Sequence, residues 1–552
     1  MEKASVDHAG AAETAPSGSI HARDVNIRAM AEGAADLGKN DQLERGLKSR
    51  HIQFLALGGA IGTGLFLGSG VILYDCGPAP LFMGYLAMMA IVWNVMNILG
   101  EMATYLPLKG ISVPYLVERF VEPSLAFACG WNYWYAYAML VGAEASAGAI
   151  LLDYWEAPVN PAVWITIILV VTLGLNIFGV ALFGEAEFWF ASIKLITIIG
   201  LILVGLVIMC GGAPAEKAIG FWYWEQPGAF NEYMAPGATG RFLAFWSAFA
   251  RAGFAFITSP ELIAVASGET VAPRRNIPKA VRRFIWRLAI FYGFGSLVIG
   301  CIVPSDDDQL LNPEANASSS PWVLGIKRAG IGVLPHIINA AILTSAWSAG
   351  NAFLYSGSRV LYSLALNGQA PRFISRTDKR GVPYIAVILT WSIGLLSYLN
   401  VDNNGAQVFT WFMNISTISG YIAWVVAMIT FMRFYKAMTW HNMLDRRPFI
   451  TPFQPYATYF FCFLLIILTL TNGFQVFWPD EFNASDFFAA YVTLPIFFVL
   501  YFVHKIVMRT PWARSIDQVD VITGVKEMEE LEASEPERVA KNIWQKIWYW
   551  IA

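Results

Sequence analysis

The sequence has little charge, few cysteines and no metal-binding spacing. Asp, Glu, Lys and Arg make up 14% of the 552 residues, whereas soluble domains carry about 25%. With 56% hydrophobic residues, this composition excludes an ordinary soluble protein and indicates an integral membrane protein. The cysteines lie in or beside apolar stretches, so we expect them to act as small hydrophobes, and we expect no disulfide framework, metal or cofactor; they are Cys76, Cys129, Cys210, Cys301 and Cys462.

The two ends of the chain lack apolar runs. Residues 1–45 are rich in Ala, Gly, Ser and charge, which is not the composition of a signal peptide and predicts a disordered cytosolic tail. Lys3 and Lys39 in this tail are candidate acceptors for ubiquitin, although nothing distinguishes them from solvated lysines. Residues 511–552 are predicted to form a cytosolic C-terminal tail.

Long apolar runs fill the region between the tails. About 20 apolar residues cross a bilayer as a helix, and twelve candidate spans are found: 54–74, 79–99, 125–150, 161–183, 188–210, 242–266, 284–303, 333–357, 384–400, 406–432, 457–477 and 487–507. The fold class is therefore predicted to be an all-α membrane protein with 12 transmembrane helices.

Basic residues are unevenly divided between the predicted loops. One side carries most of the Lys and Arg, including Arg274, Arg275 and Lys279, and this excess marks the cytoplasmic face. Both termini are then cytosolic. The sequons at Asn316 and Asn483 fall in outer loops and agree with this orientation. The basic cluster is better explained by contact with anionic lipid than with nucleic acid.

Glycines interrupt the first span. Gly58, Gly59, Gly62 and Gly64 fall within seven residues at its centre. Backbone groups freed by such a break must face protein or a wet cavity. Secondary transporters bind small molecules at broken helices near the bilayer midplane. The pattern favours a transporter of a small zwitterion.

A second interrupted span lies at 242–266, where Gly253 and Pro260 bracket the predicted break. It follows the first by five spans, and an odd number of helices inverts the second unit. We therefore predict an inverted 5+5 repeat, with spans 1–5 in residues 46–210, spans 6–10 in residues 211–432 and two extra helices in residues 433–510. The alternative is that both interruptions are kinks that serve packing.

Several motifs resemble those of fungal amino-acid permeases in the amino acid–polyamine–organocation superfamily. They are Arg45-Gly-Leu-Lys-Ser-Arg-His-Ile-Gln with Gly58-Gly-Ala-Ile-Gly-Thr-Gly-Leu-Phe, Gly100-Glu-Met-Ala-Thr-Tyr-Leu-Pro, Gly130-Trp-Asn-Tyr-Trp-Tyr, Gly268-Glu-Thr-Val-Ala-Pro and Ser345-Ala-Trp-Ser-Ala-Gly-Asn. Phe254-Ala-Phe-Ile-Thr-Ser-Pro-Glu-Leu resembles the proline-permease branch in particular. The resemblance implies a LeuT-like broken-helix fold and proton-driven uptake at the plasma membrane.

An amino acid presents a carboxylate and an ammonium group. The start of the second half of span 1 offers unpaired N–H groups and a positive dipole, which suit the carboxylate. We predict a substrate site of Ala60, Ile61, Gly62, Thr63 and Gly64, with Gly253, Phe254, Ala255 and Phe256 from span 6. The N–H groups come from residues 62–64, and carbonyls of residues 60–61 and 253–255 suit the ammonium. The alternative for Thr63 is a hydroxyl bonded back to its own helix.

Ionisable residues within spans are costly and usually face a cavity or a partner. Glu144 in span 3 and Arg251 in span 6 are predicted at overlapping depths, so they are expected to form an outer pair near the substrate, with Phe254 as an aromatic gate. The alternatives are an ion pair that serves packing and a core aromatic. Proline-carrier relatives more often have Lys at the position of Arg251, which leaves the exact substrate open.

Lys194 lies in span 5, about 10 Å from its cytosolic start. In proton-coupled relatives a lysine at this place stands where sodium-coupled ones hold the ion. We therefore predict that Lys194 and Glu144 carry proton coupling; the alternative is a lysine that snorkels to the interface or is bound permanently to carbonyls. Glu261 follows Pro260 and fits a fixed structural charge as well as it fits a coupling role. Ser345, Ser348 and Asn351 could line the cavity or form hydrogen bonds between helices.

The sequence predicts a proton-coupled importer of proline or another neutral amino acid that works by alternating access. Its expected partners are the amino acid, the proton, membrane lipid and ubiquitination machinery, with no nucleic acid. One alternative is a nutrient sensor with the same fold, and another is a permease of different or broader specificity. A membrane enzyme is disfavoured by the lack of a nucleophile–base pair or nucleotide loop, and a channel by the lack of a ring of like charge.

Overall fold

The computed structural model describes residues 62–106, 112–155, 158–178, 180–214, 217–261, 273–310, 320–401, 405–478, 482–523, 525 and 542. The described residues form helices and turns, without a strand among them. In the first half of the chain the helices are η1 (Gly64–Gly68), α3 (Ser69–Cys76), α4 (Pro78–Tyr105), α5 (Val113–Phe120), α6 (Pro123–Asp153), α7 (Pro161–Ile177), α8 (Val180–Met209), η2 (Trp224–Gly228), α9 (Gly237–Ala252) and η3 (Gly253–Phe256).

The second half is also helical. Its elements are α11 (Pro273–Leu288), η4 (Ala289–Phe294), α12 (Gly295–Ile302), α13 (Pro321–Arg328), α14 (Leu334–Leu366), η5 (Arg372–Ser375), α15 (Tyr384–Gly394), η6 (Leu395–Val401), α16 (Gly405–Trp440), η7 (Leu444–Arg446), α17 (Tyr456–Thr471), η8 (Phe474–Phe477), α18 (Ala484–Tyr491), α19 (Thr493–Met508) and η9 (Ile516–Gln518).

Seven of the described helices are long and apolar enough to cross a membrane. They are Pro78–Tyr105, Pro123–Asp153, Glu185–Met209, Arg274–Ile302, Leu334–Leu366, Tyr384–Val401 and Gly405–Trp440. The pair α18 and α19, bent by 46°, makes an eighth if it is one span, and shorter apolar helices occupy Gly64–Cys76, Pro161–Ile177 and Tyr456–Thr471. Helices overlap every predicted range, whereas the count of twelve and the inverted repeat stay predictions.

Proline residues mark the start of several helices. Pro78, Pro123, Pro161 and Pro321 stand in the first turn of α4, α6, α7 and α13. Proline suits this place because its missing N–H would have no intrahelical acceptor and its φ is already helical. These residues therefore separate the long apolar sequence into distinct helices.

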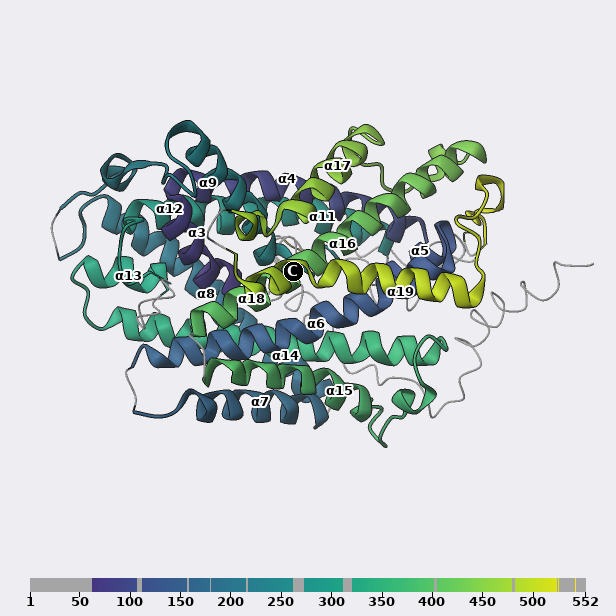
Figure 1. Ribbon diagram of the computed structural model, residues 1–552, viewed down its shortest axis with the longest axis horizontal. Coiled ribbons are helices and arrows are strands. Elements are labelled where there is room, and N and C mark those ends of the chain that lie inside the picture. Colours follow the sequence, from purple (N-terminus) through teal and green to yellow (C-terminus); the bar gives the residue numbers. More distant parts are fainter. Residues whose placement is uncertain are drawn as a thin grey trace, which may run out of the picture.

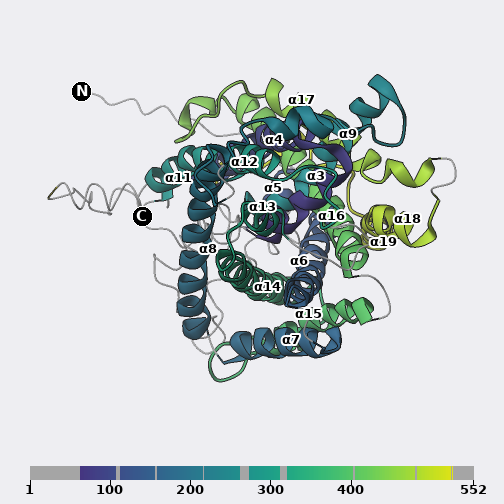
Figure 2. The same cartoon turned by 90° about the vertical axis from the view of Figure 1, so that its left-hand side faces the viewer.

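Two long helices, α6 and α14, pack along each other at the centre of the molecule (Figures 1 and 2). Figure 2 shows α8 on one side of this pair and α19 on the other, while α7 and α15 lie side by side along one edge. The opposite edge is formed by α4 and α17. This arrangement encloses η1 and η3, which are in contact with each other.

The chain after α19 folds back onto α5. Val519 and Val521 are buried, and the Tyr105 hydroxyl donates to the carbonyl of Val521 at 2.7 Å. The Nε atom of Arg119 donates to the carbonyl of Asp520 at 2.8 Å, and its guanidinium lies 3.2 Å from the Asp520 carboxylate. The segment 510–523, named here the C-terminal strap, is therefore part of the packed structure.

Candidate functional site

The second predicted break is present in the structure. Helix α9 ends at Ala252, a 3-10 turn covers Gly253–Phe256, and Ile257 leaves the helical conformation with ψ 140°. Thr258 has φ 67°, which is unfavourable for a β-branched residue. Helix resumes at Glu261. The interruption thus spans the stretch that Gly253 and Pro260 bracket, and the prediction for this span is confirmed.

The stretch after the first predicted break meets this interruption directly. The backbone bends at Gly62. Helical conformation begins at the next residue, Thr63, and continues through the apolar helix Gly64–Cys76. A Cβ atom built on Gly64 would lie 2.6 Å from the Cα of Ala255, whereas one on Gly62 would meet its first neighbour at 3.9 Å. Glycine is therefore required at position 64 because two backbones touch there.

Two tyrosine hydroxyls satisfy carbonyls at this crossing. Tyr85 of α4 donates to the carbonyl of Gly64 at 3.1 Å, and Tyr292 of η4 donates to the carbonyl of Ala255 at 2.9 Å. Their rings stack with centroids 5.8 Å apart. Because the Ala255 carbonyl already accepts from Tyr292, its predicted role toward a substrate ammonium is a poor fit.

Thr63 is oriented by Glu144 of α6. The Thr63 hydroxyl donates to Oε1 of Glu144 at 2.9 Å, so the alternative of a bond back to its own helix does not apply. Both side chains are buried, and Oε2 of Glu144 has no hydrogen-bond partner among the described residues. A buried carboxylate oxygen without a donor suits a ligand or an exchangeable proton.

Lys194 lies within electrostatic reach of Glu144. Its side chain is 1% exposed, and it interacts electrostatically with Glu144 and with Glu187. The structure therefore places the two residues predicted for proton coupling in one buried region. Glu187 is an additional member that the sequence analysis did not select.

The polar residues of α14 join neighbouring helices. The Ser348 hydroxyl lies 2.9 Å from both carboxylate oxygens of Glu187, and Nδ2 of Asn176 donates to Oδ1 of Asn351 at 2.7 Å. The hydroxyl of Ser345 is buried without a hydrogen-bond partner in the described part of the chain. Ser348 and Asn351 therefore act in helix contacts, as one of the two predicted alternatives states.

The predicted pair of Glu144 and Arg251 is wrong. Arg251 forms its ion pair with Asp75 of α3, and its second terminal nitrogen donates to the Tyr233 hydroxyl at 3.0 Å. Arg251 also lies over the Tyr233 ring, with 5.7 Å between guanidinium carbon and centroid. Glu144 instead pairs with Thr63. Asp75 was not selected because it falls at the outer end of span 1, beside ordinary interfacial residues.

The two phenylalanines predicted for the site differ in surroundings. Phe254 is 6% exposed and meets Phe409 of α16 edge to face, with centroids 5.8 Å apart. Phe256 is fully buried between Tyr85 and Tyr292, with centroids at 5.9 and 4.4 Å. The contacts of Phe256 are those of a core aromatic, while Phe254 lies next to Gly68, about one turn into the helix of span 1.

Glu261 follows the break and joins it to two long helices. Its Oε1 accepts from Nε1 of Trp424 at 2.8 Å and from the Tyr133 hydroxyl at 3.3 Å. Oε2 has no partner among the residues that the structure describes. These bonds fix the inner side of the break to α6 and α16.

Some predicted residues fall outside the described ranges. Ala60 and Ile61, together with Lys3, Lys39 and Asn316, are among them. Within the described ranges no group of three His, Cys, Asp or Glu is placed to hold a metal ion.

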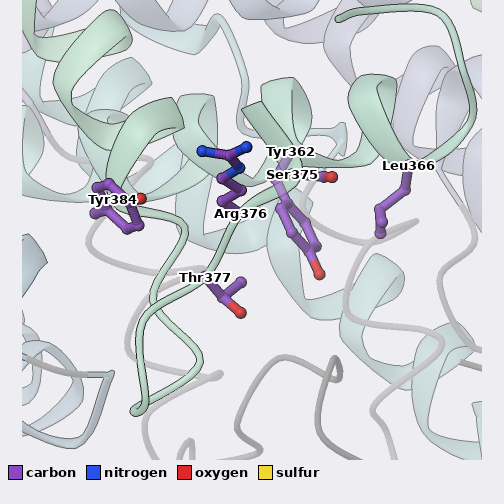
Figure 3. A pocket seen from close by; sticks show the side chains of 6 residues that line it. All are labelled: Tyr362, Leu366, Ser375, Arg376, Thr377 and Tyr384. Atoms are coloured by element: carbon purple, nitrogen blue, oxygen red, sulfur yellow. The ribbon is translucent and has the colours of Figure 1, made fainter. Parts of the chain in front are cut away.

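A surface cavity lies elsewhere, at the connection between α14 and α15 (Figure 3). Its lining residues are Tyr362, Leu366, Ser375, Arg376, Thr377 and Tyr384. Gly350 of α14 lies against Glu144, and Tyr362 follows Gly350 by twelve residues on the same helix, which is about 18 Å. This cavity is therefore separate from the crossing of η1 and η3.

Comparison with known proteins gives consistent matches. Residues 51–516 match the amino acid permease family. A proline-specific permease of Emericella nidulans is 53% identical over 94% of each chain, and one of Saccharomyces cerevisiae is 48% identical over 89% of this chain and 80% of that protein. A lysine-specific permease of Saccharomyces cerevisiae is 36% identical over 93% of this chain and 84% of that protein.

Proposed function

This chain belongs to the amino acid permease family, and from that premise we propose that it is a proton-coupled importer of proline or another neutral amino acid. The proposed substrate rests on one observation, the 53% identity with a proline-specific permease over 94% of both chains. Since such relatives are transporters, we infer transport rather than catalysis. We further propose twelve spans, arranged as the inverted repeat described above.

The crossing of the two breaks is proposed as the substrate site. The N–H groups of Gly62, Thr63 and Gly64 precede the first intrahelical bonds of their helix, so they can bind the substrate carboxylate. The ammonium would bind carbonyls of Ala60, Ile61 and Gly253, since that of Ala255 is occupied by Tyr292. Phe254 would cover the substrate from the α16 side.

Proton coupling is proposed for Glu144 and Lys194. The hydrogen bond from Thr63 links Glu144 to the proposed carboxylate site, and its electrostatic interaction with Lys194 links it to span 5. A proton bound in this region would therefore change the charge next to the substrate. Release of both would follow when the inner side opens.

The pairing of Arg251 with Asp75 supports a neutral substrate. A bare guanidinium near the site would favour an anionic side chain, whereas this one is balanced by Asp75. Position 251 carries Arg, unlike the Lys expected for proline carriers, so a broader range of neutral amino acids is the second candidate.

The membrane location is proposed from the same premise. We place the chain in the plasma membrane with both termini in the cytosol, where the N-terminal lysines could accept ubiquitin. Extracellular protease access to an epitope tag at either end of the chain tests this orientation, and cleavage in intact cells would contradict it.

The deciding experiment is radiolabelled uptake by the full chain in cells without their own amino-acid permeases. Proline, glycine, a basic and an aromatic amino acid are compared, with and without a protonophore. We expect proline accumulation that the protonophore abolishes. Accumulation that persists would contradict proton coupling. Absence of uptake together with an amino-acid-dependent growth signal would indicate a sensor.

A further inference from the structure

Glu187 of α8 is a buried carboxylate within a membrane-length helix. Its side chain is 1% exposed, and Glu185–Met209 is one of the segments apolar enough to span a bilayer. An ionisable residue at such a place is costly and usually has a partner and a function. The function proposed so far uses Glu144 and Lys194 and gives Glu187 no role.

The partner from the neighbouring helix is a hydroxyl. Ser348 of α14 lies 2.9 Å from Oε1 and 2.9 Å from Oε2 of Glu187. A hydroxyl can donate to a carboxylate and can accept from a carboxylic acid. Ser348 therefore provides a hydrogen bond to Glu187 whether or not the carboxyl group carries a proton.

Lys194 and Glu187 share one face of α8. They are seven residues apart, which is two helical turns or about 10 Å along the axis. Lys194 is buried and interacts electrostatically with Glu187 and Glu144. Because α8 is predicted to start at the cytosolic side, Glu187 lies on the cytosolic side of Lys194.

The charges of this group require a proton for neutrality. Glu144, Glu187 and Lys194 carry a net charge of −1 when all three are ionised, and one added proton makes them neutral. Among the described residues, Lys194 is the charged group whose electrostatic interaction reaches Glu187. Helix α14 contributes the hydroxyl of Ser348. Glu144 of α6 belongs to the group because it interacts with Lys194. A dry interior favours the neutral combination.

We propose that Glu187 is the residue that receives the transported proton from Lys194 and passes it toward the cytosol. This inference rests on the proposed function. In the step, an N–H bond of the Lys194 ammonium breaks while an O–H bond forms on Glu187, directly or through water. The carboxylic acid then loses its proton to cytosolic water, and the lysine takes the next proton from the Glu144 side.

The test compares two kinds of transport by the purified full chain in lipid vesicles. Uphill accumulation of radiolabelled proline is driven by a pH gradient, whereas proline–proline exchange needs no net proton release. Glu187→Gln keeps the shape and the bond to Ser348. We expect it to lower accumulation by at least about tenfold while exchange stays within about twofold of the unmodified protein.

Two further variants make the result specific. Glu187→Asp keeps a titratable carboxyl group and should recover a measurable part of accumulation. Glu185→Gln removes a carboxylate two residues away on the same helix, where the side chain is half-buried, and should leave both activities unchanged.

The outcomes separate this inference from the function on which it rests. Equal losses of accumulation and exchange in Glu187→Gln would show a structural role and overturn the relay, as would unchanged accumulation. If the unmodified protein exchanges proline but does not respond to the pH gradient, proton coupling itself fails, and the relay with it.

Discussion

At the scale of single residues, Gly64 is the most constrained position of the site. A Cβ atom there would lie 2.6 Å from the backbone of Ala255, whereas one on Gly62 has 3.9 Å to its first neighbour. We expect Gly64→Ala to abolish uptake or to lower the free energy of unfolding by about 1–3 kcal/mol, and Gly62→Ala to keep the protein folded. Uptake rates and thermal unfolding in detergent measure both effects. Normal uptake by Gly64→Ala would contradict the backbone contact.

The ion pair of Arg251 with Asp75 gives a second prediction at this scale. Arg251 is 8% exposed and Asp75 26%, so loss of either partner leaves a poorly solvated charge. We expect Asp75→Asn and Arg251→Gln to be destabilising singly, with a coupling free energy of about 0.5–3 kcal/mol in the double variant. The coupling free energy is obtained from thermal unfolding of the unmodified protein, the two single variants and the double variant. Additive effects would show that the two side chains act independently.

The sequence predicts which residues belong to the site more reliably than it predicts which side chains pair with each other. Glu144 and Lys194 are predicted because charge is costly in apolar runs, and Thr63 because it starts the second half of span 1; the structure brings all three together. The pairing of Arg251 was missed because Asp75 is 176 positions away. Which side chains meet depends on the rotation and tilt of two helices, and the residue pattern fixes neither.

At the scale of elements, tyrosines from neighbouring helices hold the crossing of η1 and η3. Tyr85 and Tyr292 donate to the backbone carbonyls of Gly64 and Ala255, where η1 and η3 meet. We expect Tyr85→Phe and Tyr292→Phe each to reduce the free energy of unfolding by about 0.5–1.5 kcal/mol, because each removes a hydrogen bond to a buried backbone carbonyl. Thermal unfolding measures the loss.

The matched control for these variants is Tyr398→Phe. The Tyr398 hydroxyl bonds the exposed Thr166 hydroxyl at 2.7 Å, and Thr166 also donates to the carbonyl of Ala162 at 2.6 Å, so Thr166 keeps a partner in the variant. If all three variants lose the same free energy of unfolding, the hydroxyl groups of Tyr85 and Tyr292 do not support the crossing of η1 and η3.

The place of the interruption in span 6 is predicted better than its backbone conformation. Gly253 and Pro260 located the interruption of span 6 because each residue weakens a helix for a known steric reason. The positive φ of Thr258 and the 3-10 turn before it were not predictable. These conformations are imposed by packing against α4, η4 and α16, which a local pattern does not contain.

At the scale of the whole molecule, the C-terminal strap joins the end of the chain to α4 and α5. Burial alone would raise the pKa of Asp520, but Arg119 and the N–H groups of Thr523 and Ile522 lower it below its ordinary value. A lowered pKa stabilises the folded state above the unfolded pKa, and this contribution is lost as pH falls through the folded value.

We therefore expect the strap to loosen below about pH 4. Limited proteolysis by pepsin between residues 510 and 523, measured relative to an unfolded reference peptide at each pH, should be slow at moderately acid pH and faster below about pH 4. Asp520→Asn should show the faster cleavage even at moderately acid pH. Cleavage that is equally slow in the variant would show that Asp520 does not hold the strap.

The strap also sets a boundary for shortened versions of this protein. Val519 and Val521 are packed inside the molecule, and Val525 is buried as well. A deletion that starts at the end of α19 would strip these side chains from the interior and uncover Tyr105, so poor surface expression would report damage to folding. Deletions meant to study the tail should therefore keep residues up to 525, so that these buried side chains stay in place.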